Sequence, residues 1–250
     1  MRLRRRIDEL RLGMMMLTRL PMGRLDDPAP TLAQARWSFP LVGLPLGLLA
    51  WAVLASAQAV NLPPLAAGFA VLAVLAGLTG GLHHDGFADF ADGMGGHDRE
   101  RRLEIMRDSR VGSYGVIALI LVTGLGASAL SALPISAWAG LLLVSLTSRL
   151  AMLVLLDLMP PARHDGLGQM AATERDALPW RVWLPGGLLT LCAALIVGPA
   201  SLPVLAAMVL TAAWVAWRAR KLLGGQTGDV LGAAQLSSET AGWLVLAAVL

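Results

Sequence analysis

The chain has little cysteine and little charge. Its one cysteine, Cys192, lies in an apolar run, so no disulfide can form within the chain and nothing indicates an oxidising compartment. Charged residues make up 15% of the 250 residues, 56% are hydrophobic, and the mean hydropathy is +0.65. These values lie outside the usual range of soluble globular domains. The composition therefore predicts an integral membrane protein.

Apolar stretches of the length that a bilayer requires recur along the whole chain. A transmembrane helix needs about 20 predominantly apolar residues. The predicted spans, of which the fifth and sixth are short, are Phe39–Val60, Leu62–Leu82, Ser113–Leu133, Ala137–Leu158, Trp183–Val197, Leu202–Trp217 and Gly232–Leu250. We predict an all-α fold, a polytopic membrane bundle of about seven (six to eight) transmembrane helices, in a single membrane domain over residues 1–250.

The segments between these spans are of two kinds. NLPP, ALPIS and VGPASLP are short and uncharged, whereas residues 1–38, 83–112, 159–182 and 218–231 hold every basic residue except Arg149. The positive-inside rule places the charged segments and the N-terminus in the cytoplasm, with the C-terminus on the opposite side of the membrane. The basic first segment lacks an apolar core with a cleavage site, so we predict a cytoplasmic arm on anionic lipid.

Acidic side chains directly follow the second predicted span, in the stretch GGLHHDGFADFADGMGGHD. At about 100° per residue, Asp85, Asp89 and Asp92 share one face of a helix, with aromatic side chains opposite. Three like charges on one face repel one another unless a cation neutralises them, and oxygen ligands suit Mg²⁺ or Mn²⁺. The sequence predicts a divalent-metal site here. A solvated acidic helix end is the open alternative.

The histidines of this stretch are poor candidates for a zinc site. His83 and His84 are adjacent, so they point to different faces of a helix, and neither an HExxH motif nor a cysteine pair accompanies them. His84, beside Asp85, is a candidate proton shuttle or phosphate contact.

An arginine-rich segment, HDRERRLEIMRDSR, comes next. Guanidinium groups bind phosphate oxygens in pairs, but the topology alone also explains basic residues here. Only Arg107 and Arg110, which flank Asp108, are predicted to touch a substrate.

The segment RKLLGGQTGDVLGA supplies a second candidate phosphate site. It combines Lys221 with Gly224, Gly225 and Asp229, and backbone N–H groups in such loops bind phosphate. It lacks the GxxxxGK[ST] pattern of a Walker loop, and a plain turn between helices would explain its glycines.

One carboxylate, Glu239, is predicted to lie deep in the last span. It follows Asp229 by roughly 15 Å of helix, and a carboxylate at that depth requires a partner or a cavity. Arg149, inside another predicted span, is the predicted partner.

These motifs together resemble the cobalamin synthase family, the adenosylcobinamide-GDP ribazoletransferases of bacterial and archaeal membranes. The resemblance covers essentially the whole chain in order, through LTRLP, FPLVGLPLG, LTGGLHHDGFADFADG, RRLEIMRDSRVGSYG, the pair Ser148–Arg149, and LGGQTGDVLGA. The core HxDGxxDxxDG followed by EIMRDSRxG is its most specific part. His83 fills the histidine position of that core, and His84 fills a variable one.

The resemblance implies a Mg²⁺-dependent transfer of α-ribazole, or its 5′-phosphate, to adenosylcobinamide-GDP with release of GMP. Under it, the three aspartates hold Mg²⁺ against the diphosphate, and Asp92 or Asp108 accepts the ribazole hydroxyl proton. His83 joins the catalytic group. The substrate-binding set is Arg107, Arg110, Arg149, Lys221, Gly224, Gly225, Asp229 and Glu239. The expected partners are the two substrates and membrane lipid, with a homo-oligomer possible and no nucleic acid.

Two alternatives stay open. A CDP-alcohol phosphotransferase of phospholipid synthesis would use similar chemistry, but its usual DGxxAR element is absent from DGFADF. An ion or proton transporter would use Arg149, Asp157 and Glu239 as a relay, and would be expected to spread ionisable residues through several spans.

Overall fold

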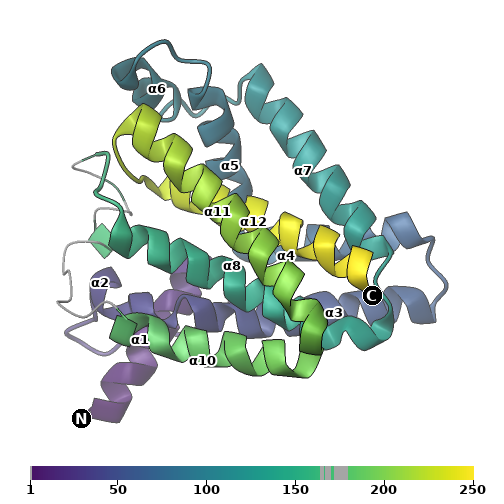
Figure 1. The fold of residues 1–250 in the computed structure, drawn as a ribbon. Helices are drawn as coiled ribbons and strands as arrows, with labels where there is room; N and C mark the ends of the chain where they lie inside the picture. Colours follow the sequence, from purple (N-terminus) through teal and green to yellow (C-terminus); the bar gives the residue numbers. More distant parts are fainter. Residues whose placement is uncertain (1, 164–165, 167–169, 172–179) are drawn as a thin grey trace.

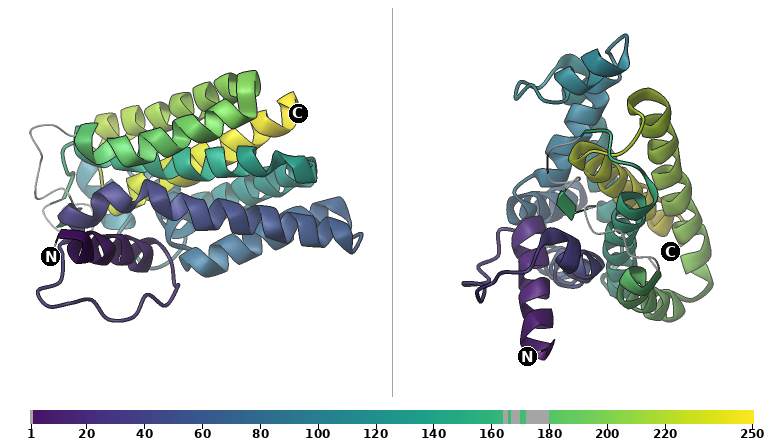
Figure 2. Two further views of the ribbon diagram at one scale, coloured as in Figure 1. Left: turned by 90° about the horizontal axis from the view of Figure 1, so that it is seen from below. Right: turned by 90° about the vertical axis from the view of Figure 1, so that its left-hand side faces the viewer.

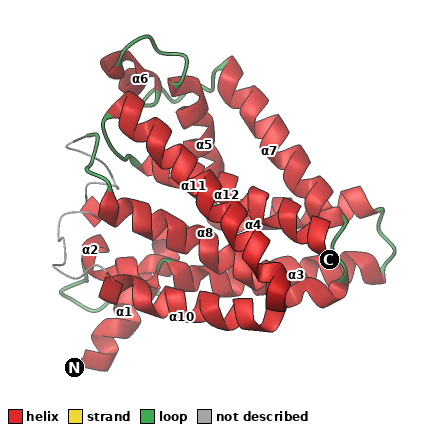
Figure 3. Ribbon diagram, in the orientation of Figure 1, coloured by secondary structure: helices red, strands yellow, loops and turns green. Residues whose placement is uncertain are grey.

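Helices make up most of the protein. The computed structural model describes residues 2–163, 166, 170–171 and 180–250, and this part of the chain contains helices and connecting turns but no strand (Figure 3). The helices are α1 (Arg2–Leu17), α2 (Leu32–Ala35), α3 (Gly43–Ala59), α4 (Pro64–Thr79), α5 (Leu82–Gly93), α6 (Arg99–Ile105), α7 (Ser113–Ser131), α8 (Trp138–Leu158), α10 (Trp180–Val197), α11 (Ser201–Leu223) and α12 (Gly228–Val249). The predicted all-α fold is confirmed.

Each predicted span contains a helix, but fewer than seven qualify as membrane-crossing. Among the described residues, four helical stretches are long and apolar enough, or up to five if α4 and α5 form one span bent by 93°. Helix α4, with 16 residues, is short. Helices α10 and α11 count as one stretch of 44 residues, although the chain reverses direction between them (Figure 1). Buried polar side chains make α12 less apolar. The predicted polytopic helical membrane bundle is confirmed, with fewer candidate spans by length and composition than the predicted seven.

The bundle has a charged end and an uncharged end. The turns after α3, α7 and α10 gather with the C-terminus at the right of Figure 1, whereas α1, α6 and the loop before α12 lie toward the other end. The view from below gives the same division (Figure 2). The loops that alternate in charge along the sequence therefore separate in space.

Helix α12 lies at the centre and packs against α5, α7, α8 and α11. Small residues permit these close approaches, as is usual between membrane helices. A Cβ atom at Gly232 would lie 3.4 Å from the Cα atom of His83, and one at Gly242 would lie 2.8 Å from Met208 Sδ. The first of these contacts brings α5 against α12.

A sharp bend between α4 and α5 directs the acidic helix across the charged end. Gly80 and Gly81 both have positive φ, 65° and 71°, a conformation that costs glycine little. The N–H of Gly81 donates to the carbonyl of Ala76 at 2.8 Å and closes α4. The two glycines before HHDG therefore set the direction of α5.

Candidate functional site

The three aspartates of α5 differ in exposure. Asp85 is exposed, Asp89 is half-buried and Asp92 is buried. The carboxylate of Asp92 accepts hydrogen bonds from the backbone N–H of Gly112 at 2.7 Å and of Gly115 at 2.9 Å. These N–H groups belong to the first turn of α7, so Asp92 caps that helix.

Both glycines make room for this cap. A Cβ atom at Gly112 would lie 2.5 Å from Asp92 Oδ1, and one at Gly115 would come closer still to Oδ2, so either would force the carboxylate out of this position. The two glycines of RVGSYG are thus explained by the Asp92 carboxylate that lies against them.

The predicted cluster of three carboxylates around one metal is not assembled in the structure. Among the described residues, no group of three histidine, cysteine, aspartate or glutamate side chains could hold a metal ion. The physical reason is that Asp92 turns toward α7 and satisfies both of its oxygens there.

Asp229, predicted to bind substrate, joins the acidic face from α12. A Cβ atom at Gly86 would lie 2.9 Å from the Cα atom of Asp229, so the glycine of HDG lets the two helices touch. Asp85 and Asp229 line one cavity, and Asp89 lies within electrostatic reach of both. Because Mg²⁺ usually takes one or two carboxylates together with water and substrate phosphate, this donor set fits that ion.

Two arginines that the sequence reasoning missed lie at this face. Arg163 Nη1 is 3.5 Å from Asp229 Oδ2. Arg19 lines an open groove of about 660 Å³ together with Asp85 and His84. Their signals were present, since Arg19 lies in LTRLP and Arg163 in PPARHDG. The next two residues of the latter motif, at 164–165, lie outside the described part of the chain.

His83, on the buried side of α5, is a further polar residue of the cavity that Asp85 and Asp229 line. His83 is 3% exposed, and its Nε2 atom has no hydrogen-bond partner among the residues that the structure describes. The cavity has a volume of about 120 Å³, and most of its wall is apolar, with Met16, Leu17, Leu32, Phe39, Met152 and Leu156 among the lining residues.

The predicted phosphate-binding arginines surround a separate groove. Arg107, Arg110 and Asp108 line an open space of about 850 Å³ that also reaches Asp92. Arg110 donates to both oxygens of Asp108, from Nη2 at 2.7 Å and from Nε at 3.0 Å. This guanidinium lowers the pKa of Asp108 to about 2. A carboxylate that holds its proton so weakly is poorly suited to accept one at neutral pH, which argues against Asp108 as the general base.

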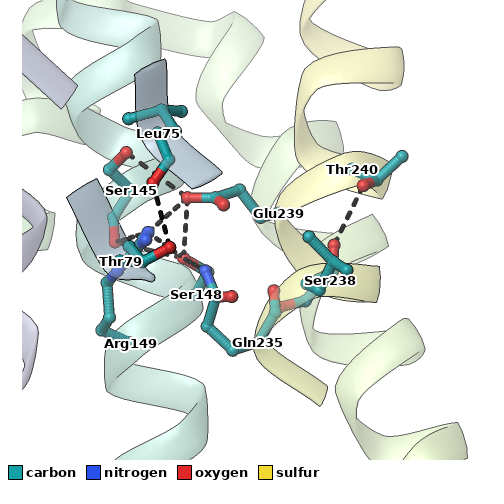
Figure 4. Close-up of polar contacts among 10 residues, drawn as sticks. Leu75, Thr79, Ser145, Ser148, Arg149, Gln235, Ser238, Glu239 and Thr240 are labelled. Carbon is teal, nitrogen blue, oxygen red and sulfur yellow. Dashed lines mark hydrogen bonds and ion pairs between the residues drawn. The ribbon is translucent and has the colours of Figure 1, made fainter. Parts of the chain in front are cut away.

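The predicted pairing of Arg149 with Glu239 is confirmed. Arg149 Nη1 on α8 donates to Glu239 Oε1 on α12, as Figure 4 shows. Arg149 also donates to the hydroxyl of Ser148 at 3.0 Å, and Gln235 donates to the same hydroxyl at 3.2 Å. Both charged side chains are buried. Neither lies on an exposed surface of this structure, so their contact with substrate stays a prediction.

The third residue of the transporter alternative, Asp157, belongs to a different pair. Asp157 Oδ1 is 3.1 Å from Arg36 Nε, and Asp157 Oδ2 accepts from Trp183 Nε1 at 2.8 Å. These contacts fix α8 to the segment after α2 and to α10. A relay through Arg149, Asp157 and Glu239 therefore has no support in the geometry.

The glycines of the loop before α12 have structural roles. Gly224 ends α11 with φ of 80°. A Cβ atom at Gly225 would collide with the carbonyl oxygen of Pro160, beside the backbone bond from Gln226 N to that oxygen at 2.8 Å. Lys221 lies over the Trp217 ring, 5.4 Å from its centroid. The plain-turn alternative thus accounts for this loop, and phosphate binding by its residues stays a prediction.

Comparison with known proteins identifies the family. A family model described as cobalamin-5-phosphate synthase matches residues 9–247. A protein of Bradyrhizobium diazoefficiens named adenosylcobinamide-GDP ribazoletransferase is 41% identical over 248 residues, which is 97% of this chain and 94% of that protein. Proteins of the same name from Azorhizobium caulinodans (41% over 236 residues, 89% of this chain and 88% of that protein) and Brucella canis (38% over 236 residues, 90% and 89%) are also similar. No solved structure matches. The chain belongs to the cobalamin-5-phosphate synthase family.

Proposed function

We propose that this chain joins α-ribazole, or its 5′-phosphate, to adenosylcobinamide-GDP and releases GMP, a late step of cobalamin biosynthesis. The observation that carries the proposal is the acidic face of α5, with Asp85 and Asp89 beside Asp229 of α12, in a chain of this family. The ribazole oxygen forms a bond to the phosphorus that carries cobinamide. The bond from that phosphorus to GMP breaks, and the hydroxyl proton passes to a carboxylate of the face.

The carboxylates would hold Mg²⁺, which lowers the charge of the diphosphate and of the leaving GMP. Asp85 is exposed toward the groove that Arg19 lines, so this groove suits the diphosphate. Arg163 holds Asp229 and thereby orients it toward α5. Asp92 acts as the cap that keeps α7 and the arginine groove next to the acidic face.

We place the reaction at the cytoplasmic side of the bacterial inner membrane. The gathering of the charged segments at one end of the bundle supports this orientation. Cysteines at the exposed positions Asn61 and Ser136 should react with an impermeant thiol reagent from the periplasm, and one at Ser109 should not. The native Cys192 is replaced by serine beforehand because it is exposed. Reversed labelling would overturn the orientation.

The activity itself is tested with purified protein, adenosylcobinamide-GDP, α-ribazole and Mg²⁺. GMP should appear in step with the joined product, and omission of α-ribazole or the variant Asp85→Asn should abolish it. A CDP-alcohol phosphotransferase would instead release CMP from CDP-diacylglycerol and an alcohol. CMP release without GMP release would reject the proposal in favour of that alternative.

A further inference from the structure

One side chain of α6 joins the ends of two other helices. Arg99, the first residue of α6, donates from Nε to the carbonyl oxygen of Leu223 at 2.9 Å and from Nη2 to that of Ala162 at 2.8 Å. Leu223 ends α11, beside which α6 lies at the charged end (Figure 1), and Ala162 follows α8. A guanidinium holds its donors in one rigid plane, so Arg99 fixes the spacing between these two segments.

The backbone of Ala162 is bound at both of its polar groups. Its carbonyl accepts from Arg99, and its N–H donates to the carbonyl oxygen of Gln226 at 2.8 Å. The N–H of Gln226 donates in turn to the carbonyl oxygen of Pro160, also at 2.8 Å. The segment after α8 is thus held between α6 and the loop before α12, and Arg163 follows directly from this fixed point.

Arg163 returns the contact to α6 and reaches the acidic face. Its Nη2 atom donates to the carbonyl oxygen of Leu103, one helical turn after Arg99, at 3.1 Å. Its Nη1 atom is 3.5 Å from Asp229 Oδ2, and the two side chains are only 15% and 22% exposed. Water therefore screens this pair less than it screens a surface pair. Helix α6 supplies both a donor and an acceptor to the segment, and so determines where Arg163 meets Asp229.

We infer that Arg99 is a positioning residue, which keeps the carboxylate of Asp229 in place beside α5 by holding the backbone that carries Arg163. The inference rests on the proposed function, in which Asp229 belongs to the Mg²⁺ site, and adds to it a residue that binds backbone carbonyls of two other segments. Groups that orient a metal ligand are typically worth about 10–100-fold in metal affinity or activity. Positive charge at the end of α11 does not by itself explain Arg99, because the last turn of that helix already carries two basic residues.

Two substitutions separate geometry from charge. Arg99→Gln removes the bridge between the two carbonyls. Arg99→Lys keeps the charge but places it on one ammonium group, which cannot reproduce the planar fork that binds both carbonyls. The matched control is Arg220→Gln, because Arg220 is an exposed arginine in the last turn of α11.

Initial rates of GMP release are measured while each substrate is varied. The value of kcat should fall by about tenfold in both Arg99 variants. The KM for either substrate should stay close to that of the wild type, because Arg99 lines neither the groove of Arg19 nor that of Arg110. Arg220→Gln should change neither value. Wild-type kcat in Arg99→Lys would reduce Arg99 to a positive charge and overturn the inference.

A double-variant cycle tests whether Arg99 acts through Asp229. Asp229→Asn alone should slow GMP release, and adding Arg99→Gln to it should cause no further loss, because no carboxylate is left to position. Residues that act independently instead multiply their losses. A double variant that is slower than Asp229→Asn by the full factor of Arg99→Gln would overturn the inference, since Arg99 would then support the fold and not the carboxylate.

Metal binding is measured without turnover, with Mn²⁺ in place of Mg²⁺. The electron paramagnetic resonance signal of free Mn²⁺ gives the Kd of the full-length protein in detergent micelles. Arg99→Gln and Arg99→Lys should each raise this Kd by about tenfold, and Arg220→Gln should leave it unchanged. The lysine variant decides if the glutamine variant fails to fold.

The outcomes of this measurement separate the inference from the proposed reaction. Equal Kd values for Mn²⁺ in the wild type and in a folded Arg99 variant would overturn the inference. A wild-type protein that binds Mn²⁺ but releases no GMP would reject only the proposed reaction. A wild-type protein that binds no Mn²⁺ would reject the metal of the proposed function and the inference with it.

Discussion

Two arginine–carboxylate pairs in this protein have opposite surroundings. The side chains of Arg149 and Glu239 are 2% and 5% exposed, between α8 and α12, whereas those of Arg110 and Asp108 are 87% and 39% exposed, just before α7. Serine and glutamine side chains surround the first pair (Figure 4). The second pair faces an open groove. A guanidinium and a carboxylate are thus paired once inside the bundle and once at its surface.

The difference follows from desolvation. Charges taken out of water are stable only when they are paired, and removal of one partner leaves the other charge uncompensated. An exposed pair loses little when it opens, because water takes over its hydrogen bonds. The buried pair is thus a permanent link between two helices. Opening the exposed pair costs little, which is what the predicted contact of Arg110 with phosphate requires.

The largest expected effect is on folding, from breaking the buried pair. Glu239→Ala should lower the free energy of unfolding by about 3–5 kcal/mol, because Arg149 is left buried and unpaired. The double variant Arg149→Met with Glu239→Leu should recover most of that loss. Unfolding in mixed detergent micelles measures both, with Arg110→Ala as the control that leaves stability unchanged. If Glu239→Ala is as stable as the wild type, the buried pair contributes no more to stability than the exposed pair does, and the comparison fails.

The next effect is on chemistry, at the acidic face. Asp85→Asn and Asp89→Asn should each slow GMP release, because each removes a carboxylate of the proposed Mg²⁺ site and with it several kcal/mol of transition-state stabilisation. The matched control is Asp98→Asn. Asp98 caps α6 through the N–H of Arg101 at 2.8 Å and lies beyond the end of α5, so its loss should change the rate less than twofold, as for most surface substitutions.

Titration with Mg²⁺ completes that test. The two α5 variants should require more Mg²⁺ for half-maximal rate, and Asp98→Asn should not. Full activity of the wild type in EDTA, or equal damage from all three changes, would remove the metal from the acidic face.

Asp92 should show a smaller effect that distinguishes a cap from a ligand. An amide at this position satisfies only one of the two N–H groups of α7, so Asp92→Asn should lower the free energy of unfolding by about 1–2 kcal/mol. If Asp92 is the cap, the Mg²⁺ concentration for half-maximal rate should equal that of the wild type. A shift as large as that of Asp85→Asn would make Asp92 a ligand as well.

The fold was largely predictable because membrane helices leave strong signals. Apolar length identified every helix of 16 or more residues in the described chain except the polar helix α1, and loop charge identified the two ends of the bundle. The polar side chains inside α12, and the bend at Gly80 and Gly81, were not predictable, because they depend on packing that hydropathy does not describe. The Arg149–Glu239 pair was predictable because a charge at membrane depth requires a partner.

The site was predictable only within one helix. The spacing of Asp85, Asp89 and Asp92 gives a common face on an isolated helix, but the approach of Gly112 and Gly115 redirects Asp92. Likewise, Gly86 meets Asp229 from a segment far along the chain. Contacts between distant segments decide which carboxylates share a site, and periodicity carries no information about them.

The smallest expected effect concerns the exposed pair. Arg110→Lys keeps the charge but loses the forked donor that now holds both oxygens of Asp108. If this guanidinium moves to a substrate phosphate, one charge-assisted hydrogen bond is lost in the reaction, and turnover should fall by about tenfold. Folding should not change, because the side chain is 87% exposed. Arg101→Lys is a suitable control, since Arg101 lines the same groove and pairs with Glu104 at 2.7 Å on the surface of α6. GMP release and micelle unfolding are measured for both variants. A tenfold loss in Arg110→Lys alone assigns the exposed pair to substrate, whereas wild-type turnover in both variants would leave it a surface contact without a function in the reaction.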